Sequence, residues 1–312
     1  MRSGAGRLHE GHPVLRQRPI LLANRLTKLV PARLRPDHTV IPVVRLSGMI
    51  SSGGTALRPS LSLASAAPLL AKAFAHKKAP AVAIVINSPG GSPVQSRLIY
   101  QRIRDLAEEK DKQVLVFVED VAASGGYMIA CAGDEIIADP SSIVGSIGVV
   151  SGSFGFVEAI AKLGIERRVH TAGSNKATLD PFQPERPEDV EHLKSLQLEV
   201  HKTFIDLVKD SRGAKLADHD DLFTGLFWSG LRGLELGLVD RLGDLRGTLR
   251  ARFGKKVKLE LVQAKRTLFG RPQPGVHAGM AAGDGMAAIG AGFAREAMGV
   301  AEERALWARF GL

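Results

Sequence analysis

Ser124 occupies a position in this sequence where covalent chemistry could occur, because it follows a run of apolar residues and precedes Gly125 and Gly126. The pattern predicts a serine between the end of a buried strand and the start of a helix. Its hydroxyl would lie near the positive end of the helix, and the backbone N–H groups after it would be free to hold an oxyanion. A serine that only caps a helix has the same setting, so the motif alone leaves both roles open.

A second glycine-bearing turn, residues 87–91 (NSPGG), also follows an apolar run. Paired glycines let the backbone approach a ligand closely and point an N–H group inward. The G-x-x-x-x-G-K-[ST] frame of a phosphate-binding loop does not surround them. Turns at the carboxyl ends of neighbouring strands meet at one edge of an α/β sheet. The two turns together therefore predict an oxyanion hole with two N–H donors.

A serine nucleophile needs a general base. Of the nine histidines, only His170 falls near the end of an expected strand, so a Ser-His-Asp triad has little support. Lys176 lies in an expected loop at 172–187, and a lysine can act as a base once burial lowers its pKa from about 10.4. Most loop lysines are solvated charges, so position alone leaves this role open. The single cysteine, Cys131, is better explained as a small buried hydrophobe than as a nucleophile.

The elements that must position these side chains alternate between strands and helices. Continuous apolar runs at 81–86 (AVAIVI) and 113–118 (QVLVFV) are typical of strands buried on both faces of a parallel sheet. We expect further strands at 39–50, 135–138, 143–150 and 165–171, with 121–123 as a short link. We expect helices at 61–74, 94–106, 124–132, 157–163 and 188–211. This alternation predicts an α/β fold with right-handed βαβ units and a mainly parallel sheet.

Five motifs follow one another along residues 39–250. They are NSPGG at 87–91, VAASGGY at 121–127, VGSIGV at 144–149, a Gly173/Lys176/Pro181/Phe182 pattern, and FTG at 223–225 with GLVD at 237–240. In this order they resemble the protease IV / signal-peptide-peptidase A family of serine peptidases. In that family the second motif contains the nucleophile, the first forms the oxyanion loop and the fourth contains a catalytic lysine.

The resemblance implies a Clp protease/crotonase-type fold, which is a superhelix of ββα units with a mainly parallel sheet. It implies that Ser124 is the nucleophile, that Lys176 is its general base and that Ser146 orients Lys176. Gly91 and Gly125 would supply the two oxyanion donors. The implied activity is that of a serine endopeptidase with a Ser-Lys dyad, which hydrolyses short or unfolded peptides without a cofactor or metal.

Two other functions could use the same framework. A crotonase-like acyl-CoA enzyme would need the same oxyanion hole, but it would leave the pair Ser124 and Lys176 unexplained. A non-catalytic scaffold of this fold would have no need of either residue.

The net charge of +10 is concentrated at the beginning of the chain. Residues 1–38 hold eight Lys and Arg against two acidic residues, which gives a net +6. We expect this basic leader to contact anionic membranes peripherally. We see no apolar segment suited to a signal peptide or a transmembrane helix, so we expect a cytoplasmic protein, and we expect no nucleic-acid partner.

The expected organisation has four parts. These are the basic leader at 1–38, a peptidase domain at 39–252, an extension of that domain at 253–270, and a flexible linker with an amphipathic helix at 271–312. The helix itself is expected at 293–310. Apolar stripes on this helix and on the one at 188–211 exceed what a single domain would cover, so we expect a homo-oligomer, formed as a ring.

Overall fold

The computed structural model describes residues 38–53, 60–263, 300–301 and 303–312. The expected leader up to residue 37 and the expected linker at 271–292 lie outside these residues, as does the first part of the expected helix at 293–310. All contacts described below lie within the unit Thr39–Leu312.

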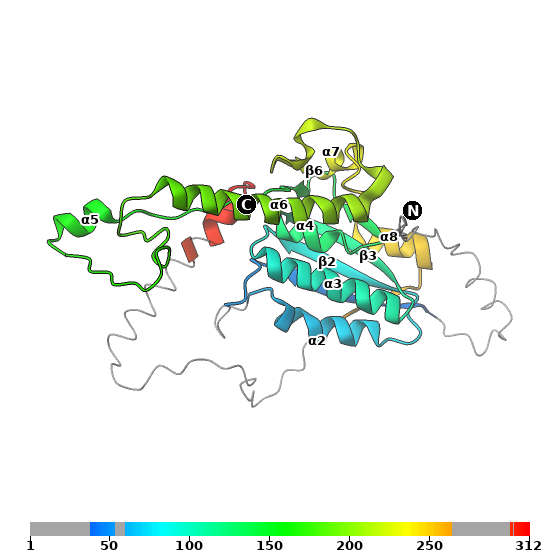
Figure 1. The fold of residues 1–312 in the computed structure, drawn as a ribbon. Coiled ribbons are helices and arrows are strands. Elements are labelled where there is room, and N and C mark those ends of the chain that lie inside the picture. Colours follow the sequence, from blue (N-terminus) through cyan, green and yellow to red (C-terminus); the bar gives the residue numbers. More distant parts are fainter. Residues whose placement is uncertain (1–37, 54–59, 264–299, 302) are drawn as a thin grey trace, which may run out of the picture. The chain divides into compact units, whose positions relative to one another are not determined.

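An eight-stranded sheet forms the centre of this unit (Figure 1). Its strands are adjacent in the order β6-β5-β3-β2-β1-β8, while β4 pairs with β3 and β7 pairs with β4. The strands are β1 (Val40–Ser47), β2 (Ala81–Ser88), β3 (Gln113–Ala123), β4 (Glu135–Ala138), β5 (Ile143–Gly145), β6 (Phe227–Ser229), β7 (Arg241–Leu242) and β8 (Lys258–Leu261). Among these pairs only β5 and β6 are antiparallel. The expected α/β fold with a mainly parallel sheet is confirmed.

Helices cover both faces of the sheet, so that every residue of β2 is buried. The helices are α2 (Leu63–Phe74), α3 (Pro93–Glu109), α4 (Gly125–Ala130), α5 (Val157–Lys162), α6 (Pro187–Arg212), α7 (Gly230–Glu235) and α8 (Leu245–Phe253). Val82, Ile84 and Ile86 enter a core with α2, α3, α4 and the last turns of α6. Ala81, Ala83 and Val85 enter a second core against α8. Side chains along a strand point alternately to opposite faces, which explains the continuous apolar run.

The structure corrects two expected boundaries near Ser124. Residues 121–123 are not a link, because β3 continues through them. The first part of β3 pairs with β4, and residues 121–123 pair with β5. The strand expected at 143–150 ends at Gly145, because Gly145 and Ser146 have φ of 97° and 52°. Positive φ does not occur in a regular strand. Both corrections bring a predicted site residue directly to the end of a strand.

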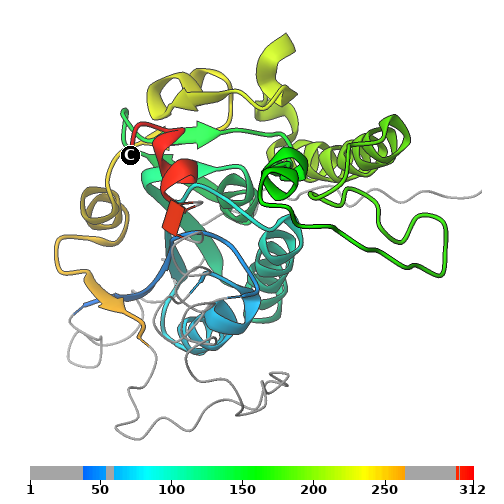
Figure 2. The same cartoon turned by 90° about the vertical axis from the view of Figure 1, so that its left-hand side faces the viewer.

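Residues 151–186, here called the arm, connect the segment after β5 to the start of α6. Figures 1 and 2 show the arm with α5 extending past the first part of α6 and away from the sheet. No residue of α5 is buried. The strand expected at 165–171 is wrong: these residues form no strand, because no neighbouring strand pairs with them. A β-strand needs such a neighbour to satisfy its backbone hydrogen bonds.

Candidate active site

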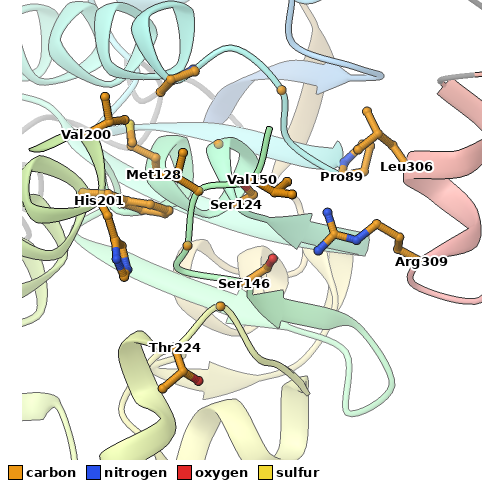
Figure 3. A pocket seen from close by; sticks show the side chains of 17 residues that line it. Pro89, Ser124, Met128, Ser146, Val150, Val200, His201, Thr224, Leu306 and Arg309 are labelled. Carbon is orange, nitrogen blue, oxygen red and sulfur yellow. The ribbon is translucent and has the colours of Figure 1, made fainter. Parts of the chain in front are cut away.

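A pocket of about 520 Å³ lies where β2, β3 and β5 end side by side (Figure 3). Gly91 follows β2, Ser124 and Gly125 follow β3, and Ser146 follows β5; all four line the pocket. Three motifs that are far apart in the sequence therefore meet in one cavity at the carboxyl edge of the sheet. This is the edge where open α/β sheets bind ligands.

Ser124 has a strained backbone and an uncommitted hydroxyl. Its φ of 51° and ψ of −121° lie where residues other than glycine rarely occur, and such a conformation costs about 1–3 kcal/mol. Its N–H donates to the carbonyl of Gly145 at 2.8 Å, which holds the residue between β3 and β5. Although Ser124 stands at the N-cap position of α4, its side chain makes no capping hydrogen bond. The helix-cap alternative therefore does not explain this serine.

Gly91 and Gly125 place two backbone N–H groups at the pocket beside Ser124. Within the part of the chain that the structure describes, neither N–H donates a hydrogen bond to the protein. Both positions exclude a side chain. A Cβ on Gly91 would lie 2.1 Å from the carbonyl oxygen of Ile50, and a Cβ on Gly125 would lie 2.3 Å from Ser96 Oγ. Two free donors beside a serine hydroxyl can stabilise the oxyanion formed in acyl transfer.

The NSPGG turn is fixed against its neighbours by the side chains of its first two residues. Asn87 Nδ2 donates to Asp120 Oδ2 at 2.6 Å, and Asn87 Oδ1 accepts from the Val121 N–H at 3.2 Å. Ser88 Oγ donates to the carbonyl of Gly48 at 2.7 Å. These bonds tie the end of β2 to β3 on one side and to the end of β1 on the other, which makes the position of the donors rigid.

Ser146 is only 4% exposed and lies on the pocket wall. Its N–H donates to the carbonyl of Leu226 at 2.8 Å, so the chain after β5 is held against the segment before β6. Figure 3 shows its hydroxyl directed toward the same space as Ser124.

Lys176 lies elsewhere. It is exposed on the arm and is not among the residues that line the pocket. Its N–H bonds to the carbonyl of Gly173 at 3.2 Å, which closes a local turn. The single chain thus brings together Ser124, Gly91, Gly125 and Ser146, but it does not bring Lys176 to them.

Known proteins share much of this sequence. The profile of peptidase family S49 matches residues 107–259. A protein of Synechocystis sp. that is named as a protease is 33% identical over 206 residues, which cover 64% of this chain and 74% of that protein. This chain belongs to peptidase family S49. The chloroplastic serine protease SPPA of Arabidopsis thaliana is 32% identical over 209 residues, covering 66% of the S49 chain and 31% of that protein.

A longer relative is similar to nearly the whole S49 chain. A Brucella abortus protein named Na⁺/H⁺ antiporter NhaA is 65% identical over 292 residues, or 93% of this chain. The S49 chain spans only 39% of that protein's length. Membership of the family confirms the resemblance seen in the sequence. It supports a peptidase over an acyl-CoA enzyme or a non-catalytic scaffold.

His201 also lines the pocket of the S49 peptidase, although its place on the long helix α6 did not suggest this. Its Nε2 lies 3.0 Å from the carbonyl oxygen of Ile147. Because a carbonyl can only accept, Nε2 carries the proton in this contact. Its spacing could have indicated this place, because His201 lies beside Val200 and Phe204 of the apolar stripe of α6. Both of these residues line the pocket too.

Leu306 and Arg309 reach the pocket from the end of the chain. Residues 303–312, here called the C-terminal segment, contain a helix at 303–308 and a closing turn. Nothing in the motifs indicated this placement, because it depends on where the segment packs.

Cys131 is buried, and burial raises the pKa of its thiol to about 12. The prediction of a small buried hydrophobe is confirmed. In the described ranges, no group of three or more His, Cys, Asp or Glu side chains could hold a metal ion. No helix found in those ranges is long and apolar enough to cross a membrane.

Proposed function

We propose that this S49 peptidase is a serine endopeptidase in which Ser124 is the nucleophile and Lys176 is the general base. One observation carries the proposal. Ser124 has a strained backbone and a side chain that makes no capping hydrogen bond, and it lies beside the free N–H donors of Gly91 and Gly125. Ser146, on the pocket wall, would orient the lysine amine by a hydrogen bond.

The reaction would proceed by acyl transfer. Neutral Lys176 takes the proton of the Ser124 hydroxyl while Oγ attacks the carbonyl carbon of the peptide. The carbonyl oxygen becomes an oxyanion, held by the N–H groups of Gly91 and Gly125. The C–N bond then breaks and Lys176 gives its proton to the leaving amine. Lys176 next removes a proton from water while the water oxygen bonds to the acyl carbon. The bond from that carbon to Ser124 Oγ then breaks, Lys176 returns the proton to Oγ, and the acyl product leaves as a carboxylic acid.

The walls of the pocket support an extended peptide as substrate. Apolar side chains line much of it, namely Met128, Val149, Val150, Val200 and Phe204. An apolar side chain of a peptide could be buried there, while a folded protein could not place a backbone carbonyl against Ser124. We therefore propose short or unfolded peptides as substrates.

Because Lys176 lies on the arm, we propose that it completes the site of a neighbouring chain in a homo-oligomer. The arm and the first half of α6 expose large apolar side chains that a neighbour would cover. Phe154 is 72% exposed, Leu163 is 73% exposed and Leu198 is 68% exposed. Exposed apolar surface of this extent is typical of an interaction site. A ring of such chains would bring each arm to the next pocket.

Mixed oligomers test the shared site. Ser124→Ala and Lys176→Ala chains carry different tags, are co-expressed, and are purified through both tags. Each variant alone should lose at least about 100-fold in kcat/KM, since a general base supplies about 10²–10⁴-fold. The mixed oligomer should regain activity. Lys162→Ala, another exposed lysine on the arm, should stay near wild type.

Four results would contradict parts of the proposal. Wild-type activity of Ser124→Ala would remove the nucleophile assignment. Retention of more than about a tenth of wild-type kcat/KM by Lys176→Ala would remove the base assignment. No recovery in oligomers shown to contain both chains would confine the dyad to one chain, and a monomer by light scattering would remove the oligomer.

The basic leader would bring the peptidase to anionic membranes. Its net +6 within residues 1–38 supports this part of the proposal, since each basic residue near an anionic surface contributes about 1 kcal/mol.

A further inference from the structure

The C-terminal segment brings a positive charge to the pocket that contains Ser124. Of the lining residues that the structure describes, Arg309 alone carries a permanent charge, and no Asp or Glu is among them. Figure 3 shows its guanidinium extending from the C-terminal segment toward Ser124 and Ser146. Leu306, one turn earlier in the same segment, lines the pocket as well.

The C-terminal segment is anchored directly behind the nucleophile. Phe310 is buried against Val121 and Ala123, the last part of the strand that ends at Ser124. Its ring also packs edge-on against Phe227 with 4.9 Å between ring centroids. Trp307 joins the same apolar cluster. Arg309 therefore stands next to a buried residue in contact with β3, and this contact fixes the side of the pocket from which its guanidinium extends.

The charge of Arg309 is not neutralised within the described part of the chain. No carboxylate pairs with it there, and its guanidinium carbon lies 5.8 Å from the ring centroid of the neighbouring Phe310. A guanidinium presents a planar set of donors that matches a carboxylate with two parallel hydrogen bonds. The arrangement fits a bound anion better than it fits a structural ion pair.

We propose that Arg309 forms a carboxylate-binding subsite beside Ser124, so that the enzyme prefers peptides with a carboxylate close to the bond that is cleaved. The proposal rests on the function proposed above. The carboxylate could be an acidic side chain or the free C-terminus of a short peptide, since both present the same two oxygens.

Matched fluorogenic peptides test the preference. One set carries Glu, Gln or Lys at each position beside the scissile bond, and a second set compares a free with an amidated C-terminus. The wild type should cleave the Glu peptide, or the free-acid peptide, about tenfold faster in kcat/KM than its neutral match, because charge-assisted hydrogen bonds are about twice as strong as neutral ones but solvent weakens this exposed one. The set that shows the effect identifies the source of the carboxylate. The preference should shrink at high salt.

Variants at position 309 separate charge from shape. Arg309→Gln should cleave charged and neutral peptides equally, Arg309→Lys should retain part of the preference, and Arg309→Glu should favour the Lys peptide. Arg304→Gln is the matched control, because Arg304 is an exposed arginine of the same segment that does not line the pocket. It should keep the wild-type preference.

A measurement of peptide binding tests the subsite independently of peptide cleavage. Ser124→Ala protein should bind the acidic peptide about tenfold more tightly than the neutral one by fluorescence anisotropy, and Ser124→Ala/Arg309→Gln should not discriminate. Equal binding and equal cleavage of acidic and neutral peptides would overturn the subsite while leaving the proposed function intact. A rise in cleavage of all peptides alike in Arg309→Gln would also overturn it, since the segment would then only cover the pocket. Full activity of Ser124→Ala would instead overturn the proposed function, and the binding ratio would still decide the subsite.

Discussion

Gly91→Ala should damage both the fold and the proposed oxyanion hole. The new Cβ would lie 2.1 Å from the carbonyl oxygen of Ile50 and 2.9 Å from its nitrogen. Ile50 is held in place by two hydrogen bonds of 2.8 Å, from its N–H to the carbonyl of Gly90 and from the Ser92 N–H to its own carbonyl. The turn can accept the methyl group only if these bonds break or lengthen.

The cost can be worked out from these contacts. Two buried hydrogen bonds are worth about 1 kcal/mol each. The φ of +138° at Gly91 adds about 1 kcal/mol of strain for any residue with a side chain. We therefore expect Gly91→Ala to lower the free energy of unfolding by about 3 kcal/mol. Alanine keeps the backbone N–H, but the shifted turn would move it away from the oxyanion. The remaining folded enzyme should therefore lose about 10²–10³-fold in kcat, which is the usual effect of losing one oxyanion donor.

Gly48→Ala is the matched control, because Gly48 lies in the adjacent turn. It has the backbone strain of a positive φ but not the steric clash of the added Cβ. Its φ is +95°, but nothing lies within 4 Å of the added Cβ, so it should lose only about 1 kcal/mol and little activity. Urea unfolding can be followed by the fluorescence of Trp228 and Trp307, and peptide hydrolysis by a fluorogenic substrate. If Gly91→Ala were as stable and as active as Gly48→Ala, the close packing of the NSPGG turn would be wrong.

Three further predictions concern other parts of the chain. Burial would raise the pKa of Asp240, but its hydrogen bond and charge interaction with the buried Arg212 hold that pKa below the ordinary value. The stabilising effect of the Asp240 carboxylate should be complete above about pH 4 and be lost as the pH falls below that. Asp240→Asn should lower the free energy of unfolding by about 3 kcal/mol at pH 7 and remove this part of the acid sensitivity. An unchanged acid-unfolding curve for Asp240→Asn would contradict this. The Cys131 thiol, with a pKa of about 12, should resist Ellman's reagent in the native protein at pH 8 and react once per chain in urea; rapid native labelling would show that it is accessible. Deletion of residues 1–38 should reduce co-sedimentation with anionic liposomes at low salt, and equal binding of both forms would exclude a role of the leader.

The sequence predicted the centre of the fold and most of the pocket because local patterns determine them. The run at 81–86 has the composition of a strand buried on both faces, and β2 is such a strand. Ser124, Gly91, Gly125 and Ser146 each follow a strand of one parallel sheet, so the topology alone brings them to the same edge.

Other features depend on contacts that no local pattern contains. Residues 165–171 have the composition of a strand but no neighbour to pair with. Arg309 reaches the pocket only because Phe310 finds an apolar site on β3 and β6. The position of Lys176 relative to Ser124 depends on the course of the arm, which no local pattern determines.

The contact between the two glycine turns also limits which residues could replace Ser124 as the proposed nucleophile. Gly90 lies so close to Ser124 that a Cβ on Gly90 would be 2.8 Å from the Ser124 Cβ. Cysteine changes only the atom beyond that carbon and so leaves the contact as it is. Threonine adds a methyl group to the crowded carbon itself, at a φ of 51° that is especially unfavourable for a β-branched residue. An exchange of serine for cysteine is therefore open to this site, whereas an exchange for threonine would require both turns to move together.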